Sequence, residues 1–291
     1  MRRSNGCRCF PDMKRLAIIG FGHIGASLAG TLNASTEIIA IDRDAGVLQK
    51  ARERGLARET SSDLAACRDA DQVLLSVPVK TCVSILRNVL DQMDPGALLL
   101  DVASTKGVLL EEFHRTGSPM RYISLHPLAG TEKPGIDSAR PDVFRGMPFL
   151  VLPVQNANTD DVAEVDRMIR ECGSLKIPVK SIEEHDATLA LTIHLPHVLA
   201  YALTHLAEES SETLSTDVFA LAGRSFRDST RVASSDIQMV HDFLTTNTGR
   251  TASAIDRLVE HLERIKKLLV AGNDEELKKL MQSARELRKR L

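Results

Sequence analysis

A glycine-rich turn that directly follows a short aliphatic run constrains this chain more than any other feature. Leu16-Ala-Ile-Ile19 has the length and apolarity of a buried strand, and Gly20-Phe-Gly-His-Ile-Gly25 comes immediately after it. Three glycines at this spacing allow a tight turn, a close approach of the backbone to a pyrophosphate, and close packing of the following helix on the strand. The turn alone is a weak signal, so its context decides what it means.

A second aliphatic run ends at an acidic residue. Glu37-Ile-Ile-Ala-Ile41 precedes Asp42, which follows Gly25 at close to the spacing of roughly 20 residues found in dinucleotide-binding folds. A carboxylate there accepts hydrogen bonds from ribose hydroxyls and repels a 2′-phosphate, so we expect NAD, with NADP possible because Arg43 comes next. A flavodoxin-like turn without a dinucleotide is the alternative. The predicted cofactor contacts are Gly20, Phe21, Gly22, His23, Ile24, Gly25, Asp42, Arg43, Ser76, Val77 and Pro78.

Aliphatic runs of strand length alternate with helical patterns up to about residue 180. Runs that are apolar on both faces suit a parallel sheet covered by helices on each side. We therefore predict an α/β fold for residues 13–180, with a doubly wound sheet of Rossmann type. The predicted strands are 16–19, 37–41, 72–77, 97–101, 121–125, 148–152 and 175–179, and the predicted helices are 23–33, 45–54, 81–92, 106–114 and 159–172.

The pattern changes after residue 180. From Glu183 onwards the chain contains a single proline, which is Pro196, and no run that we interpret as a strand. Helical periodicity predicts an all-helical substrate and dimerisation domain over residues 181–291, with Gly272 ending one helix and Asn273 or Asp274 capping the last. The apolar stripes of these helices are either intramolecular core or a dimer seam, and we expect a homodimer because they exceed what one small helical layer covers.

The bulk composition excludes several classes of function. The chain has 291 residues and a formal net charge of −2, so we expect no nucleic-acid partner held by a basic surface. We find no apolar run of the roughly 20 residues that cross a bilayer and expect no membrane partner. Residues 1–12 contain arginines but no apolar core, which predicts a disordered leader, or an upstream start before Met13, rather than a secretory signal. The cysteines form no CxxC pair, so we expect no metal site, reduced thiols and a cytoplasmic protein.

Four polar clusters follow the later strands or lie in the helical half. They are Asp101-Val-Ala-Ser-Thr-Lys-Gly107, His126-Pro-Leu-Ala-Gly-Thr-Glu-Lys-Pro-Gly135, Glu184-His-Asp186 with His194-Leu-Pro-His197, and Phe226-Arg-Asp-Ser-Thr-Arg231. On these motifs, in this order, the chain resembles the prephenate/arogenate dehydrogenase family of tyrosine biosynthesis. The resemblance implies oxidative decarboxylation of prephenate to 4-hydroxyphenylpyruvate, or of arogenate to tyrosine, with hydride transfer to NAD(P). It also implies a cyclohexadienyl small molecule as substrate and dimerisation through the helical half.

The resemblance implies roles for particular side chains. His126 matches the catalytic histidine, whose neutral imidazole, with a pKa expected near 6.5, accepts the proton of the ring hydroxyl. Ser104 matches a serine that bonds the same region, with a helix N-cap as its alternative role. Arg231 matches an arginine that holds a substrate carboxylate through a planar fork, with an exposed helix arginine as the alternative. Glu132 and Asp228 match an ionic gate near the pocket mouth. A core role is the alternative for either histidine below, and a surface charge is the alternative for the other three residues. The remaining expected substrate contacts are His197, His194, Glu132, Asp228 and Arg227.

Three positions depart from the family pattern near the expected substrate pocket. Ile193 stands where a serine usually precedes the first histidine, Ser225 stands where a glycine precedes the phenylalanine, and Met239-Val240 replaces Met-Trp. These departures leave prephenate, arogenate and an amino analogue of prephenate open as substrates.

Two other functions fit the sequence less well. A dehydrogenase of the 3-hydroxyacid type would carry a catalytic lysine on the first long helix of its second domain, where this chain has His194 and His197. A catalytically silent NAD-binding sensor would not need Ser104, His126 and Arg231 together. Both are therefore less favoured than the dehydrogenase of a cyclohexadienyl compound.

Overall fold

The computed structural model describes residues 13–129 and 135–290, so the expected leader lies outside the described residues. The first half is built on an eight-stranded sheet in the order β3-β2-β1-β4-β5-β6-β7-β8. Neighbouring strands are parallel except β6 and β7, which are antiparallel. The strands are β1 (Arg15–Ile19), β2 (Glu37–Ile41), β3 (Glu59–Ser61), β4 (Gln72–Leu75), β5 (Leu98–Asp101), β6 (Arg121–Pro127), β7 (Pro148–Gln155) and β8 (Leu175–Pro178).

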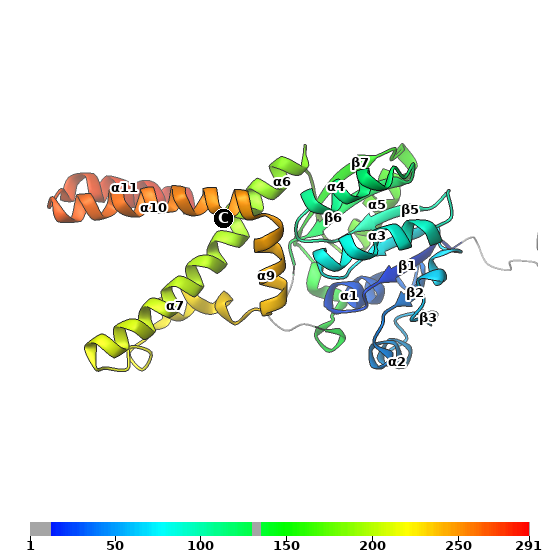
Figure 1. The fold of residues 1–291 in the computed structure, drawn as a ribbon, viewed down its shortest axis with the longest axis horizontal. Coiled ribbons are helices and arrows are strands. Elements are labelled where there is room, and N and C mark those ends of the chain that lie inside the picture. Colours follow the sequence, from blue (N-terminus) through cyan, green and yellow to red (C-terminus); the bar gives the residue numbers. More distant parts are fainter. Residues whose placement is uncertain (1–12, 130–134, 291) are drawn as a thin grey trace, which may run out of the picture.

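Helices cover the sheet on both sides, which confirms the predicted doubly wound fold (Figure 1). Each predicted strand and helix of this half has an observed counterpart, whereas β3 was not predicted because its three residues, Glu-Thr-Ser, show no apolar pattern. The helices are α1 (His23–Leu32), α2 (Ala45–Glu53), α3 (Val79–Gln92), α4 (Gly107–Thr116) and α5 (Thr159–Glu171), with short 3-10 turns η1 (Leu64–Cys67), η2 (Ile136–Ser138) and η3 (Pro141–Phe144).

Strand β1 shows why aliphatic runs form the centre of this sheet. Successive side chains of a strand point to opposite faces. Leu16 and Ile18 pack into the core on one face, while Ala17 and Ile19 pack into a second core on the other face. Since both faces are covered, both sets of side chains are apolar.

The helical half begins after β8 and extends away from the sheet. Figure 1 shows α9 facing the sheet domain, while α7 and the paired helices α10 and α11 project from it. Gly272 has a φ of +62° after α10, and the Asn273 side chain accepts a hydrogen bond from the backbone of Glu276, so both predicted helix boundaries are confirmed. The elements are α6 (Ile182–Leu189), a π-helical turn η4 (Ala190–His194), α7 (Leu195–Leu214), α8 (Arg224–Thr230), a 3-10 turn η5 (Arg231–Ser234), α9 (Ile237–Thr246), α10 (Thr248–Val270) and α11 (Asp274–Arg288).

One segment corrects the expectation that no part of the chain matches a membrane span in length and apolarity. Among the described residues, the helical segment Ile182–Leu214 reaches a mean hydropathy of 1.3 over its most apolar window, of which 33% is buried within the protein. A core helix of a soluble protein meets the same criteria. The polar residues His185, Asp186 and His194 in this segment are buried and bonded to neighbouring elements.

Candidate active site

A cleft of about 460 Å³ opens at the carboxyl ends of the sheet strands, with α9 of the helical half on its other side. The neighbours β1 and β4 mark the point where the strand order reverses, which is where open α/β sheets bind ligands. The volume lies in the range of small-molecule sites, roughly 300–1,000 Å³. The lining includes His23, Ile24, Ser76, Val77, Pro78, Ser104, His126, Asp236, Gln238, Met239 and Asp242.

The glycine turn between β1 and α1 has three different steric surroundings. Gly20 has a φ of +91°, and a Cβ on it would lie 2.6 Å from the carbonyl oxygen of Ser76. A Cβ on Gly25 would lie 2.3 Å from the carbonyl oxygen of Gly20, so the helix packs against the turn only without a side chain there. Gly22, in contrast, faces open space, and no side chain caps α1. The helix N-terminus therefore offers backbone N–H groups to an anion.

Asp42 connects the end of β2 to the glycine turn. Its Oδ2 accepts a hydrogen bond of 2.8 Å from the backbone N–H of Phe21, and its Oδ1 accepts one of 3.0 Å from Asp44. A carboxylate has about four acceptor sites, so further hydrogen bonds to ribose hydroxyls remain available. Arg43, directly after it, is exposed. The contact of Asp42 with a ribose stays a prediction.

Two buried polar atoms beside the cleft fit a bound dinucleotide. Ser76 Oγ and His23 Nε2 have no hydrogen-bond partner among the residues that the structure describes. His23 Nδ1 lies 2.9 Å from the carbonyl oxygen of Ser138, so Nδ1 donates and Nε2 carries a lone pair. Buried polar groups without partners cost free energy, and a ligand with polar groups in the cleft would supply the missing hydrogen bonds.

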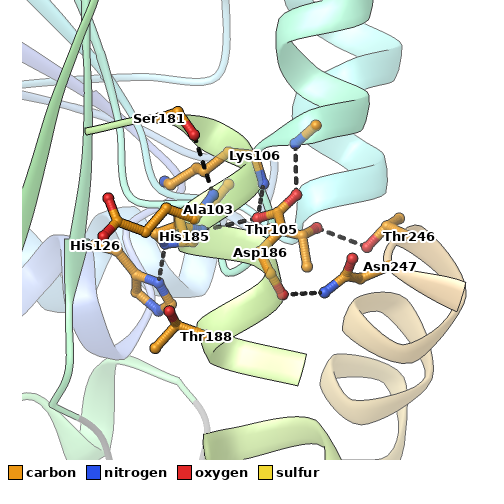
Figure 2. Close-up of polar contacts among 12 residues, drawn as sticks. Ala103, Thr105, Lys106, His126, Ser181, His185, Asp186, Thr188, Thr246 and Asn247 are labelled. Carbon is orange, nitrogen blue, oxygen red and sulfur yellow. Dashed lines mark hydrogen bonds and ion pairs between the residues drawn. The ribbon is translucent and has the colours of Figure 1, made fainter. Parts of the chain in front are cut away.

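His126 lies at the carboxyl end of β6 and lines the cleft with 9% of its surface exposed. Its Nδ1 is 3.0 Å from Nε2 of His185 on α6, as Figure 2 shows. Burial, and then the positive charge of Lys106 together with His185 and His194, hold the pKa of His126 well below 6.5. The expected pKa near 6.5 is therefore corrected downwards, and the imidazole is neutral at pH 7.

The charge of Lys106 is buried next to this histidine. Its Nζ donates a hydrogen bond of 2.6 Å to Asp101 Oδ1 and one of 2.6 Å to the carbonyl oxygen of Leu125. Asp101 also accepts a hydrogen bond of 2.6 Å from the hydroxyl of Tyr122. Because Asp101 compensates the ammonium group, the cation can stay buried close to His126.

Sequence reasoning used Glu184-His-Asp186 only as a family signature and missed the contacts of its last two residues. Asp186 accepts hydrogen bonds from the backbone N–H of Lys106 at 3.0 Å and of Gly107 at 2.9 Å, and it lies 2.8 Å from His185 Nδ1. Burial alone would raise the pKa of Asp186, but these hydrogen bonds outweigh it and lower the pKa below its usual value. The available signal was a histidine and an aspartate side by side in the first turns of a helix.

Of the other residues predicted for catalysis or substrate binding, Ser104 lines the cleft, whereas His194 and His197 are buried behind it. Ser104 follows β5 and lines the cleft together with His126. Its alternative role as a helix cap is excluded, because Lys106 is the N-cap of α4. His194 is buried, stacks on Phe243 with ring centres 4.6 Å apart and lies 3.1 Å from Thr251 Oγ1. His197 is buried and its Nδ1 is 2.8 Å from the carbonyl oxygen of Ile193. Neither of these two histidines is among the residues lining the cleft.

Three of the predicted charged contacts, Arg231, Arg227 and Asp228, are not among the residues that line the cleft. Arg231 is exposed at the start of η5, and Arg227 and Asp228 are exposed on α8. Arg227 lines a separate open groove with Phe219 and Phe226, and Asp228 lies 3.5 Å from Arg224. Glu132 lies outside the described residues. The roles of these residues toward the substrate stay predictions.

Sequence reasoning also missed polar residues that α9 brings to the cleft. Asp242 is 3% exposed, accepts a hydrogen bond of 2.8 Å from Gln238 and lies 3.5 Å from Lys80 Nζ on α3. It therefore links the helical half to the sheet domain at the mouth of the site. The available signal was a carboxylate that directly precedes the apolar pair Phe243-Leu244.

Family profiles match both halves of the chain. The profile described as "Prephenate dehydrogenase, nucleotide-binding domain" covers residues 28–177. The chain belongs to the prephenate dehydrogenase family. The profile "Prephenate dehydrogenase, dimerization domain" covers residues 181–283. One profile therefore matches most of the sheet half of this prephenate dehydrogenase family member, and the other matches most of its helical half.

Individual relatives agree with this assignment over most of their length. The chain is 29% identical to a cyclohexadienyl dehydrogenase of Zymomonas mobilis over 91% of each chain. It is similar to the structure of prephenate dehydrogenase from Aquifex aeolicus in complex with hydroxyphenyl propionate and NAD+, with a TM-score of 0.88, 28% identity, and coverage of 96% of this chain and 98% of that one. Synechocystis arogenate dehydrogenase gives a TM-score of 0.83, 27% identity, and coverage of 95% and 99%.

Proposed function

We propose that the chain catalyses NAD-dependent oxidative decarboxylation of a cyclohexadienyl substrate, either prephenate or arogenate. The observation that carries this proposal is His126, a buried and neutral imidazole that opens into the same cleft as the start of α1. The relatives named above act on, or are named for, cyclohexadienyl compounds, prephenate and arogenate, and one of them was crystallised with NAD+.

The chemistry needs a proton acceptor, a hydride acceptor and a path for CO2. Bound NAD+ supplies the two-electron hydride acceptor, and the glycine turn, Asp42 and Ser76 would hold it. His126 accepts the hydroxyl proton of the substrate while the C–H bond at the same ring carbon breaks and hydride leaves. The C–C bond to the ring carboxylate breaks in the overall reaction, CO2 departs, and the electrons of that bond complete the aromatic ring. The phenolate oxygen then takes a proton, which gives the hydroxyphenyl product and returns His126 to its neutral form. Ser104, which lines the same cleft, would hydrogen-bond the reacting hydroxyl.

The substrate carboxylates need cationic or donor groups. We assign the main role to Arg231, whose planar guanidinium can bind a carboxylate through two hydrogen bonds. It lies a short distance along the chain before Asp236, which lines the cleft. His197 and His194 would shape the pocket behind α9. Arg227, Asp228 and Glu132 stay substrate contacts that the family resemblance predicts.

Assembly and location are part of the same proposal. The helical half matches a dimerization domain, and we propose that residues 181–291 form a homodimer while residues 13–180 bind the cofactor. The exposed apolar side chains of α7 and α10 support this, because pairing with a second copy would remove them from water. We place the enzyme in the cytoplasm, with no nucleic-acid or membrane partner.

The direct test is NADH formation by the purified chain with prephenate, with arogenate and with an amino analogue of prephenate. We expect turnover with at least one of the first two, and a loss in kcat of about 10²–10⁴-fold in His126→Asn with much smaller changes in KM. His114→Asn, an exposed histidine on α4, is the matched control and should behave like the wild type. Absence of NAD+ reduction with all three compounds would exclude the proposal.

A further inference from the structure

Three side chains connect α4 to the cleft through a continuous line of contacts. Asp186 lies against the N-terminus of α4, His185 lies 2.8 Å from Asp186 through Nδ1, and His126 lies 3.0 Å from His185 Nε2 through its own Nδ1 (Figure 2). All three are buried, with 1%, 2% and 9% of their surface exposed in that order. Only the last of them lines the cleft.

Asp186 is held in place by two other segments of the chain. Its carboxylate accepts the backbone N–H groups of Lys106 and Gly107 at the start of α4. Its backbone carbonyl accepts a hydrogen bond of 2.7 Å from the Asn247 side chain, which lies between α9 and α10. A carboxylate at a helix N-terminus is also favoured by the helix dipole. The Asp186 carboxylate, which ends the series of contacts from His126 through His185, therefore has little freedom to move.

The hydrogen positions follow from this anchor. The pKa of Asp186 is lowered, so its carboxylate is ionised and can only accept, which requires the hydrogen on His185 Nδ1. Burial lowers the pKa of His185, so this ring is neutral and its Nε2 has a lone pair. Nδ1 of His126 must then donate to that lone pair. In a neutral ring this leaves the lone pair of His126 on Nε2.

We propose that His185 and Asp186 are positioning residues that hold His126 in the tautomer with its hydrogen on Nδ1, so that Nε2 presents a lone pair to the cleft. In a free imidazole the hydrogen prefers Nε2, and His126 in that form would offer the substrate a donor instead of a base. The kinetic part of this inference rests on the proposed function, whereas the tautomer itself does not.

The same line of contacts stabilises the charge that His126 gains during the reaction. When Nε2 accepts the hydroxyl proton, His126 becomes an imidazolium whose Nδ1–H already points to His185. Three charged groups face the rings of His126 and His185. They are Lys106 at the start of α4, Asp101 at the end of β5 and Asp186 on α6, and the titratable ring of His194 on η4 also faces His126. Asp186 opposes the repulsion from Lys106, so removing its charge should move the protonation of His126 to still lower pH.

Nitrogen NMR of the wild-type protein labelled with ¹⁵N-histidine tests the tautomer without any substrate. Long-range nitrogen–hydrogen correlations distinguish a ring protonated at Nδ1 from one protonated at Nε2, and His126→Asn assigns the signals. We expect His126 and His185 both to carry the hydrogen on Nδ1 at pH 7.5. A His126 that carries it on Nε2 would overturn the proposal, even if the enzyme is fully active. Correct tautomers without turnover would instead point to failure of the proposed function.

Kinetics of three variants test the consequence. His185→Leu removes the acceptor for His126 Nδ1–H, so kcat should fall about 10–100-fold while both KM values change little. His185→Gln places an amide oxygen where Nε2 was and should recover most of that loss. Asp186→Asn keeps an oxygen for His185 but removes the charge, so the acidic limb of the pH–rate profile should shift to lower pH. An unchanged kcat in His185→Leu, or a His185→Gln variant as slow as His185→Leu, would refute the positioning role.

Discussion

At the residue scale, burial decides the protonation state of the site. His126, His185 and His194 are buried, and burial lowers the pKa of each, that of His194 to about 4. Their neutral forms therefore persist in the folded protein to pH values where an unfolded chain, with pKa values near 6.5, is already protonated. The stability they contribute is present above about pH 6.5 and is lost as the pH falls through the lower folded values. A base that stays neutral over this range suits proton abstraction near neutral pH.

We expect one residue, Asp42, to decide which cofactor is preferred. Asp42 holds the glycine turn and keeps acceptor sites for ribose hydroxyls, so we expect a higher kcat/KM with NAD+ than with NADP+. Asp42→Ser should reduce or reverse this preference, because the repulsion of a 2′-phosphate is gone and Arg43 can meet it. Asp63→Ser, a helix-capping aspartate after β3, is the control that should leave the preference unchanged. Equal kcat/KM for both cofactors in the wild type would contradict the assignment.

At the element scale, the contact between α1 and β1 depends on two glycines with opposite surroundings. Gly25 leaves no room for a methyl group beside the carbonyl of Gly20, whereas Gly22 has nothing within 4 Å. Gly25 therefore serves the packing of the helix, and we expect Gly22 to allow a ligand to approach the helix N-terminus. The structure shows that the two positions differ in their surroundings, which the glycine spacing alone does not reveal.

Two alanine variants should distinguish these functions. Gly25→Ala forces the helix away from the turn, so we expect a destabilisation of about 1–3 kcal/mol, measured by urea unfolding. Gly22→Ala should unfold at nearly the wild-type urea concentration, since its φ of −79° suits alanine, yet bind NAD+ at least tenfold more weakly in a calorimetric titration. A Gly22→Ala variant with wild-type affinity would show that the phosphates lie elsewhere.

At the scale of the whole molecule, the helical half is open. Helices α7 and α10 project from the sheet domain, and large apolar side chains along them are exposed, among them Leu206 at 59%, Val259 at 50% and Leu262 at 52%. Apolar surface of this extent on a soluble protein marks an interaction site. The name of the matching profile, a dimerization domain, agrees with this interpretation.

We expect the purified chain to sediment as a dimer at micromolar concentration. Leu206→Glu combined with Leu262→Glu should shift it toward monomer, because charges would then face apolar surface of the partner. Arg264→Glu, which changes an exposed charge on the same helix, should leave the dimer intact. A wild-type protein that sediments as a monomer at that concentration would exclude the homodimer.

The sequence by itself determined those features that depend on neighbouring residues. The aliphatic runs, the glycine turn after β1, the helix stop at Gly272 and the cap at Asn273 are local, so their patterns predicted the elements that the structure contains. The cofactor contacts that the glycine turn predicts stay predictions. The edge strand β3 escaped prediction because three polar residues become a strand only by pairing with β2. The motif around His126 indicated the chemistry through its resemblance to a family.

The tertiary structure alone decided how the site works. His126, Lys106 and His185 are far apart in the sequence, and only the packing of β6, α4 and α6 brings their side chains together. Their protonation states follow from burial and from charges supplied by other elements, which no local pattern encodes. The cleft likewise exists only because α9 lies across the strand ends. Sequence determines which groups are present, whereas the pKa of each group and the direction of each hydrogen bond depend on distances between separate segments.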